Sequence, residues 1–291
     1  MKGSSTEISG TTHMVTMIGS PVSHSVSPAT HTLAYKKMGI DSVFLVFDIG
    51  VEDLPVVMGA FRVMKGWDST TVTMPCKQAI IPFLDELSPA AELAGAVNVV
   101  TKEDGKIVGH NADGAGFMNN LANQGVKIKG AAMTLLGPGG AGSAILAQAA
   151  LDGVSRIDAF ARRGGRSFVN GAELKKWVEA ATDCAVNIYA IEDEDQLRRS
   201  IAESDILANC TDVGMGEGNT EAPIDPDLIK PGMVVAEAIN TPRITQLLKE
   251  AERRGCTVYG GLGMNDQQAV VADKIRYGVE IPIKEIRAEL A

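Results

Sequence analysis

The chain has 291 residues, of which 45% are hydrophobic and 22% charged, with a formal net charge of -9. A chain of this length exceeds the usual size of one hydrophobic core, so we expect two domains. The negative charge argues against a broad electrostatic footprint for nucleic acid or anionic lipid, and any bound anion must be held locally.

The chain shows no secretory or membrane signature. Its start lacks a basic segment followed by an apolar one, and the uncharged stretch 131–151 is interrupted by GPGG. The four cysteines are far apart, with no C-x-x-C spacing, and the histidines are scattered. We therefore expect a cytoplasmic protein with reduced cysteines, no bound metal, no nucleic acid partner and no membrane partner.

Short apolar β-rich runs alternate with amphipathic helical patterns from Met14 onward, which predicts an α/β fold. Ser27 followed by Pro28 predicts a helix with Ser27 as its N-cap. The Asp104-Gly105 pair predicts the turn of a hairpin. In the first half we expect strands over 14–19, 42–49 and 69–74, and helices over 28–38 and 51–65.

The second half predicts a Rossmann-like, doubly wound parallel sheet. A buried strand passes through a glycine-rich turn into a helix over 131–151, and RIDAFARR, VNIYAI, DILANC and MVVAEAI follow as strands. Two last helices are expected over 264–278 and 282–290, the first returning to the N-terminal domain. We expect a discontinuous α/β substrate-binding domain, a dinucleotide-binding domain and a cleft between them, with domain bounds 1–112 plus 263–291 and 113–262.

The segment LLGPGGAGSA predicts a dinucleotide site. A strand that ends in such a turn and leads directly into a helix lets backbone N–H groups approach a pyrophosphate. A glycine cluster also fits a purely structural turn, but the strand before it and the helix after it favour the nucleotide site. The candidate cofactor-binding residues here are Gly137, Gly139, Gly140 and Ala141.

The loop after the next predicted strand favours NADP over NAD. It holds Arg162, Arg163 and Arg166, and no carboxylate follows until Glu173. Guanidinium groups pair with phosphate, whereas NAD sites use an acidic residue to bind the ribose hydroxyls. The alternative is that the three arginines are simply solvated.

Hydride transfer to a carbonyl needs a proton donor near the new alkoxide. Lys77 follows the third predicted strand, at the end where α/β sheets bind ligands, and Asp113 lies where the chain crosses into the nucleotide domain. We predict that they form a catalytic pair. The alternative for Lys77 is a solvated helix-end residue.

The segment GSPVSHSVSPATH precedes a predicted helix N-terminus. The hydroxyls of Ser25 and Ser27, together with the helix dipole, are suited to a substrate carboxylate. N-capping alone would explain Ser27 but not Ser25.

Together these residues resemble the shikimate dehydrogenase family, which includes quinate/shikimate dehydrogenases. The resemblance runs in one collinear order from about Met14 to the C-terminus. It rests on seven segments: GSPVSHSVSPATH, TVTMPCK, GAVNVV, GHNADGAG, GPGGAG, NCTDVGMG and GLGMNDQQA.

The resemblance implies an NAD(P)-dependent dehydrogenase that interconverts 3-dehydroshikimate and shikimate, with NADP preferred. It implies a small-molecule substrate and allows a homodimer. The roles it implies are substrate-carboxylate binding by Ser25 and Ser27; ring-hydroxyl contacts by Thr73, Asn98 and Gln268; catalysis by Lys77 and Asp113; and cofactor binding by the glycine turn, the three arginines, Thr211 and Gly261.

Several positions depart from the family pattern. Thr71, Val99, Ala112 and Asn240 replace polar or aromatic residues of the family motifs, and Asn265 and Asp266 replace apolar ones. A site that reads hydroxyl groups is sensitive to one unmatched partner. The alternatives are therefore a quinate-preferring enzyme that uses NAD, a related cyclohexane carboxylate as substrate, and a non-catalytic ligand sensor.

Overall fold

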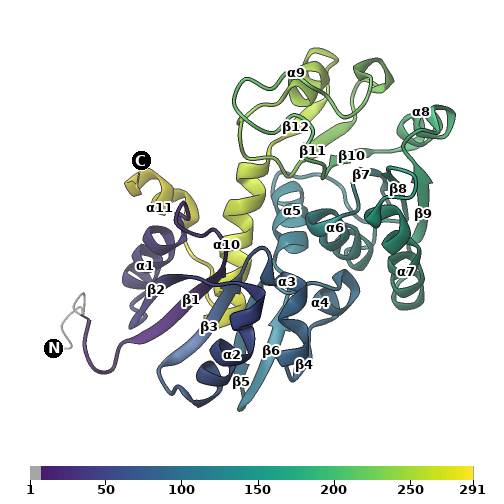
Figure 1. Cartoon of the computed structure of the whole chain (residues 1–291). Coiled ribbons are helices and arrows are strands. Elements are labelled where there is room, and N and C mark those ends of the chain that lie inside the picture. Colours follow the sequence, from purple (N-terminus) through teal and green to yellow (C-terminus); the bar gives the residue numbers. More distant parts are fainter. Residues whose placement is uncertain (1–7, 291) are drawn as a thin grey trace. The chain divides into compact units, whose positions relative to one another are not determined.

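The structure is a computed structural model that describes residues 8 to 290 (Figure 1). The chain divides into two compact units, which are described separately. The first unit is Met1–Ala112 with Ala269–Ala291, and the second unit is Asp113–Gln268. The boundary between Gln268 and Ala269 falls inside helix α10 (Gly261–Tyr277).

The first unit contains a mixed six-stranded sheet in the order β2-β1-β3-β5-β6-β4. Strand β1 is parallel to β2 and β3, whereas β5 is antiparallel to both β3 and β6. The strands are β1 (His13–Gly19), β2 (Ser42–Asp48), β3 (Trp67–Val72), β4 (Glu86–Leu87), β5 (Val99–Glu103) and β6 (Lys106–His110).

The local predictions in this unit are largely confirmed. Asp104 and Gly105 both have positive φ, 49° and 83°, as a two-residue hairpin between β5 and β6 requires. Strand β3 has the predicted six residues but lies two positions earlier, at Trp67–Val72 instead of 69–74. The prediction that Ser27 caps a helix is wrong: the helix begins at Ser27, its N-cap is Val26, and the cap makes no side-chain bond.

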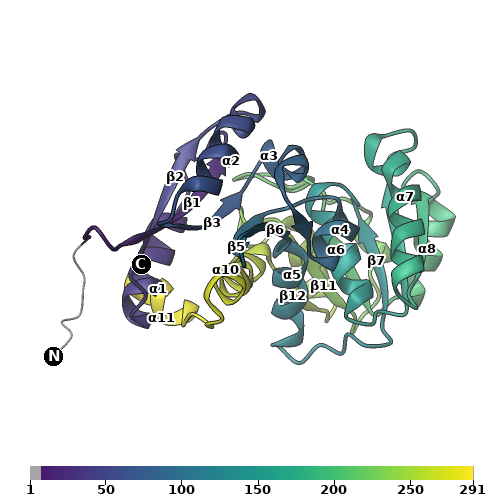
Figure 2. The same ribbon diagram turned by 90° about the horizontal axis from the view of Figure 1, so that it is seen from below.

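Helices cover both faces of the first sheet. One face packs against α1 (Ser27–Met38), the last turns of α10 and α11 (Ile283–Leu290), and Figure 2 shows α1 beside α11. The other face holds a core around Trp67, Met58 and Ile80. The remaining helices and 3-10 turns of the first unit are η1 (Val51–Asp53), α2 (Leu54–Val63), α3 (Cys76–Ala79), η2 (Ile81–Phe83) and α4 (Pro89–Ala94).

The second unit contains an all-parallel six-stranded sheet in the order β12-β11-β10-β7-β8-β9. The strands are β7 (Ala132–Leu136), β8 (Arg156–Ala161), β9 (Ala185–Ala190), β10 (Ile206–Asn209), β11 (Val234–Glu237) and β12 (Thr257–Tyr259). The strand order reverses between β7 and β10, which confirms the Rossmann-like prediction. Such sheets bind ligands outside the carboxyl ends of the strands at this reversal.

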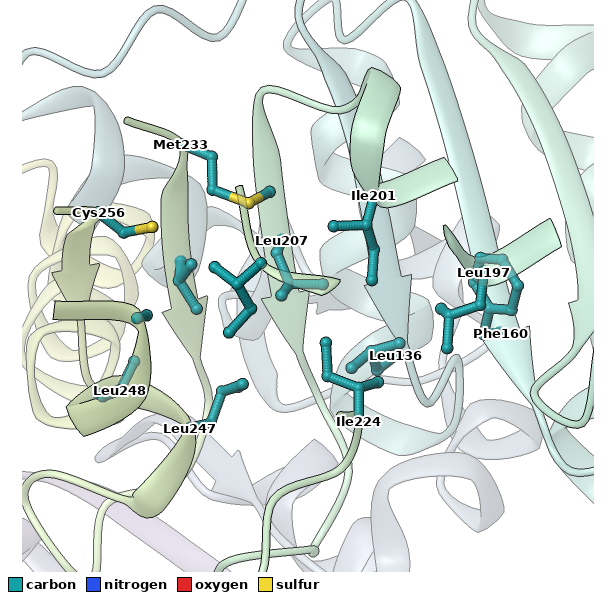
Figure 3. Packing of buried hydrophobic residues seen from close by; sticks show 13 residues of the cluster. Leu136, Phe160, Leu197, Ile201, Leu207, Ile224, Met233, Leu247, Leu248 and Cys256 are labelled. Atoms are coloured by element: carbon teal, nitrogen blue, oxygen red, sulfur yellow. The ribbon is translucent and has the colours of Figure 1, made fainter. Parts of the chain in front are cut away.

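The core on one face of the second sheet is shown in Figure 3, where side chains of α8 and α9 face those of β7, β8 and β10. The helices and the 3-10 turn of this unit are α5 (Asp113–Ala122), α6 (Gly140–Leu151), α7 (Arg166–Ala181), α8 (Glu194–Glu203), η3 (Pro226–Leu228) and α9 (Gln246–Arg253). Across residues 8 to 290, no helix is long and apolar enough to cross a bilayer.

Candidate functional site

The glycine turn follows β7 in the second unit. Gly137 has a φ of 80°, and its N–H donates to the carbonyl of Phe160 at 2.9 Å. A Cβ on Gly137 would lie 2.7 Å from Cγ2 of Thr211. Only glycine therefore fits this corner, where the ends of β7, β8 and β10 meet.

Gly142, which was not among the predicted residues, is a second position of this turn where a side chain does not fit. A Cβ at Gly142 would lie 2.0 Å from the carbonyl oxygen of Gly137, whereas a Cβ at Gly140 would meet nothing within 4 Å. The sequence did carry a signal for this position, because Gly142 is the last glycine of the segment GPGGAG. The turn thus packs tightly against the first turn of α6 and leaves open space at Gly140.

This open space suits a pyrophosphate. Helix α6 begins at Gly140 with Gly139 as its N-cap, and Ala141 lies in its first turn. The first N–H groups of a helix have no acceptor within it, and the helix dipole adds a partial positive charge there. The backbone at Gly139, Gly140 and Ala141 can therefore hold the phosphates of a dinucleotide.

Arg162, Arg163 and Arg166 lie just beyond the end of β8, next to the strand that ends at the turn. All three are exposed. Within the described part of the chain their guanidinium groups form no ion pair, while the backbone N–H of Arg163 donates to the Glu192 carboxylate at 3.2 and 3.3 Å. Three unpaired guanidinium groups suit the 2'-phosphate of NADP.

A buried carboxyl group supports the loop after β10. Oε2 of Glu237 accepts from the Thr245 hydroxyl at 3.0 Å and from Asn209 Nδ2 at 3.5 Å. Oδ1 of Asn209 in turn accepts from the hydroxyl of Thr211 at 2.7 Å. Burial raises the pKa of Glu237 to about 7, although the two hydrogen bonds oppose the shift.

Gly261 begins α10, and its N–H donates to the carbonyl of Ile239 at 3.0 Å. A Cβ on Gly261 would lie 2.5 Å from the carbonyl oxygen of Ala238. The helix therefore starts in direct contact with the chain that leaves β11. This places both Thr211 and Gly261 after carboxyl ends of strands of the second sheet.

In the first unit, Ser25 and Ser27 lie at the start of α1. The N–H of Ser27 donates to Oγ of Ser25 at 3.2 Å, and both residues are partly buried. Neither hydroxyl has a recorded acceptor among residues 8 to 290. Both can therefore donate to an anion at the N-terminus of the helix.

Asn98 is fully buried just before β5. Its Oδ1 accepts from the backbone N–H of Ala112 at 2.7 Å, and its Nδ2 has no partner in the described structure. A buried amide donor without a partner is costly unless a ligand engages it. Thr73 lies close in the fold, because the neighbouring Val72 N–H donates to the carbonyl of Asn98 at 2.8 Å.

Lys77 is tied to the same segment. It lies in α3, it is partly buried, and its carbonyl accepts from the N–H of Val97 at 2.8 Å. The backbone of Lys77 is thus hydrogen-bonded to Val97, the residue directly before Asn98.

Asp113 and Gln268 are brought together in the second unit. Asp113 is the first residue of α5 and is buried, and Gln268 Nε2 donates to its Oδ1 at 2.8 Å. Asp113 directly follows Ala112, whose N–H is held by Asn98. The pairing of Lys77 with Asp113 stays a prediction, because the two residues belong to different units.

The fold and the residues at its strand ends define an NAD(P)-dependent oxidoreductase that acts on a CH–OH group. The family model described as the shikimate dehydrogenase substrate binding domain matches residues 17–100. A shikimate dehydrogenase (NADP(+)) of Listeria monocytogenes serotype 4b is 42% identical over 284 residues, which cover 96% of each chain. The chain belongs to the shikimate dehydrogenase family.

Solved structures agree with this assignment. The chain is similar, with a TM-score of 0.93 and 40% identity over 98% of both chains, to a shikimate 5-dehydrogenase from Listeria monocytogenes in complex with shikimate and NAD. It is also similar, with a TM-score of 0.84 and 30% identity over 97% of this chain and 96% of the other, to a shikimate dehydrogenase in complex with NADP+.

Proposed function

We propose that this protein catalyses the reversible reduction of 3-dehydroshikimate to shikimate with NADPH. The observation that supports this most is the fully buried amide of Asn98, whose Nδ2 has no partner in the described structure. Such a donor fits a hydroxylated substrate bound beside Lys77. An apolar ligand would leave the desolvation of this group uncompensated.

Each functional group of the substrate has its own binding residues. The hydroxyls of Ser25 and Ser27 bind the carboxylate at the start of α1. Thr73, Asn98 and Gln268 bind the ring hydroxyls. These neutral partners fix the orientation of the ring, so that one of its carbons faces the cofactor.

Lys77 and Asp113 handle the proton. During reduction the Lys77 ammonium donates a proton to the oxygen of the C3 carbonyl, and during oxidation the amine takes it back. Asp113 orients Lys77. Asp113 is itself held by Gln268 at 2.8 Å, so substrate binding and proton transfer share one hydrogen-bonded group.

The cofactor is held by the second unit. Gly137, Gly139, Gly140 and Ala141 receive the pyrophosphate, and Arg162, Arg163 and Arg166 receive the 2'-phosphate. Thr211 and Gly261 lie at the strand ends beside it. When bound, NADP accepts or donates the hydride at C4 of its nicotinamide ring.

The runner-up is a quinate dehydrogenase that uses NAD. The replacements at Thr71, Val99, Ala112 and Asn240 motivate this alternative. Val99 and Ala112 are fully buried and pack in the core with Ala272, so their side chains offer no polar contact. The exposed, unpaired arginines favour NADP over NAD.

Steady-state kinetics with shikimate or quinate, each combined with NADP+ or NAD+, tests the proposal. We expect the highest kcat/KM for shikimate with NADP+. A higher value for quinate with NAD+ would favour the runner-up. Stabilisation by both ligands without any reduction of the nicotinamide would instead favour a ligand sensor.

We place this activity in the cytoplasm, where the four cysteines would stay reduced, as they are in the structure. We keep a homodimer as a proposal for the state of association. Light scattering of the purified protein distinguishes a dimer from a monomer, and no residue named above has to come from a second copy.

A further inference from the structure

A fully buried ion pair lies in the first unit, outside the catalytic set. Nη1 of Arg276 donates to Oδ1 of Asp273 at 2.9 Å, and neither side chain has any exposed surface. Both residues lie one turn apart in α10. Burying two charges is costly unless their remaining hydrogen-bonding groups also have partners.

Asp273 receives two further hydrogen bonds from α1. The hydroxyl of Tyr35 donates to Oδ1 at 2.9 Å, and Nδ1 of His31 lies 2.7 Å from Oδ2. Burial alone would raise the pKa of Asp273, but His31 and Arg276 outweigh it, and the pKa is lowered. The carboxylate is therefore kept ionised and fixed between α1 and α10.

Arg276 extends the cluster to β3. Its Nε donates to Oγ of Ser69 at 3.0 Å, and its Nη2 donates to Oγ1 of Thr71. The guanidinium also lies over the ring of Phe44, 5.7 Å from its centroid. The orientation of this arginine is thus defined by the carboxylate, two hydroxyls and an aromatic ring.

The bond to Thr71 has a chemical consequence. An arginine can only donate, so Oγ1 of Thr71 is the acceptor and its own proton must go elsewhere. Within residues 8 to 290 the hydroxyl of Thr71 has no recorded acceptor, and the residue is partly exposed. Its O–H is therefore available to an outside oxygen.

Thr71 is placed among the substrate-binding candidates. It pairs with Val99, the residue after Asn98, and it precedes Thr73 by two positions along an extended segment, which puts the two threonines on the same face. Asn98, whose Nδ2 has no partner in the described structure, lies just before β5, the strand that pairs with β3 at Thr71.

We propose that Thr71 is a specificity-determining residue that donates a hydrogen bond to an oxygen of the polyhydroxylated substrate, with Arg276 as the positioning residue that directs this proton outward. This rests on the proposed function. Asp273, His31 and Tyr35 hold Arg276 in place. Thr71 departs from the family pattern, but its hydroxyl still gives the substrate a polar contact at this position.

The test begins with Thr71→Val and Thr71→Ser, assayed with shikimate and NADP+. Loss of the hydroxyl in Thr71→Val should raise the KM for shikimate at least about tenfold and leave kcat within about threefold, since ground-state and transition-state binding weaken together. Thr71→Ser keeps the O–H and should restore a KM close to that of the wild type.

Arg276→Lys tests the positioning role. A lysine keeps the charge beside Asp273 but lacks the planar set of donors that reaches Ser69 and Thr71 together. We expect a raised KM in Arg276→Lys, and no further rise when Thr71→Val is added. If the two substitutions acted independently, their free energies would add and their fold-increases in KM would multiply. A double variant whose KM rises by this product would contradict the positioning role.

Thr16→Val is the matched control. Thr16 is a buried threonine of β1 that donates to Thr70 at 2.7 Å, and Thr70 and Thr71 point to opposite faces of β3. It should lower thermal stability without changing the KM. An unchanged KM in Thr71→Val, or a KM raised equally by Thr16→Val, would overturn the inference.

The inference and the proposed function fail in different ways. A wild-type protein that does not oxidise shikimate contradicts the proposed function. In that case, titration calorimetry of shikimate with the wild type and Thr71→Val still tests the contact. Equal affinities for the two proteins would overturn it, and weaker binding by Thr71→Val alone would support it.

Discussion

Asn98 and Ala112 are joined by a hydrogen bond of 2.7 Å, in which the buried side-chain oxygen of Asn98 accepts from the backbone N–H of Ala112. This bond determines which atom of the amide remains available. It assigns the oxygen to the protein and leaves Nδ2, the donor, for a ligand. It also links the residue directly before Asp113 to the segment just before β5, where the Val97 N–H donates to the Lys77 carbonyl.

Replacing Asn98 with alanine should therefore have two separable effects. Loss of the acceptor leaves the Ala112 N–H unpaired and should lower the free energy of unfolding by about 1–3 kcal/mol. Loss of the donor should raise the KM for shikimate about tenfold or more. Chemical denaturation and steady-state kinetics measure the two effects, and a destabilised variant with an unchanged KM would contradict the binding role.

Gly140 and Gly142 should respond differently to alanine. Gly142→Ala forces a Cβ to within 2.0 Å of the Gly137 carbonyl oxygen, so it should lower the melting temperature. Gly140→Ala meets no protein atom within 4 Å, so it should leave the melting temperature nearly unchanged and weaken NADP+ binding. Thermal unfolding with and without NADP+ measures both, and normal cofactor binding by Gly140→Ala would argue against a pyrophosphate there.

The arginine loop sets cofactor preference in this account. Arg162→Ala combined with Arg163→Ala should raise the KM for NADP+ by about 10- to 100-fold and that for NAD+ by less than about threefold, since only NADP has the 2'-phosphate. Arg198→Ala, an exposed arginine of α8, serves as the control. Equal losses with both cofactors would mean that the loop does not read the 2'-phosphate.

Glu237 predicts a pH dependence of stability. Its pKa is about 7 in the folded chain, against an ordinary value of 4.5. A carboxyl group with a raised folded-state pKa binds more protons when folded, so its contribution is complete below about pH 4.5 and is lost as the pH rises through about 7. At about 1.4 kcal/mol per pKa unit, this shift corresponds to a loss on the order of 3 kcal/mol.

Glu237→Gln mimics the protonated acid and should remove this dependence. Between about pH 5.5 and pH 8.5 the wild type should lose more stability than the variant, as measured by denaturant unfolding at each pH. Parallel curves for the two proteins would show that Glu237 does not titrate in this range.

Much of the fold follows from local patterns. The glycine turn, the Asp104-Gly105 hairpin and the long strands are encoded by residues that lie next to one another, and they are confirmed. Strands β4 and β12 were not predicted, because segments of two and three residues carry no periodicity. The helix start at Ser27 was misplaced by one residue because Pro28 fits either of the first two helical positions.

The hydrogen-bonded partners within the site were less accessible from the sequence. The Asp113–Gln268 bond joins residues 155 positions apart, and the resemblance named both without pairing them. Asp273 and Arg276 were not predicted as site residues, because charges three positions apart on a helix usually form a solvated surface pair. Only the packing of α10 against His31 and Tyr35 of α1 turns them into a buried cluster.

The most direct test of the account is the kcat of Lys77→Ala with saturating shikimate and NADP+, compared with the wild type and with Lys65→Ala, an exposed lysine outside the site. We predict that kcat falls by about 10²-fold or more in Lys77→Ala, with little change in KM and no effect of Lys65→Ala. A Lys77→Ala variant that keeps nearly the full wild-type kcat would contradict the assignment of proton transfer to Lys77.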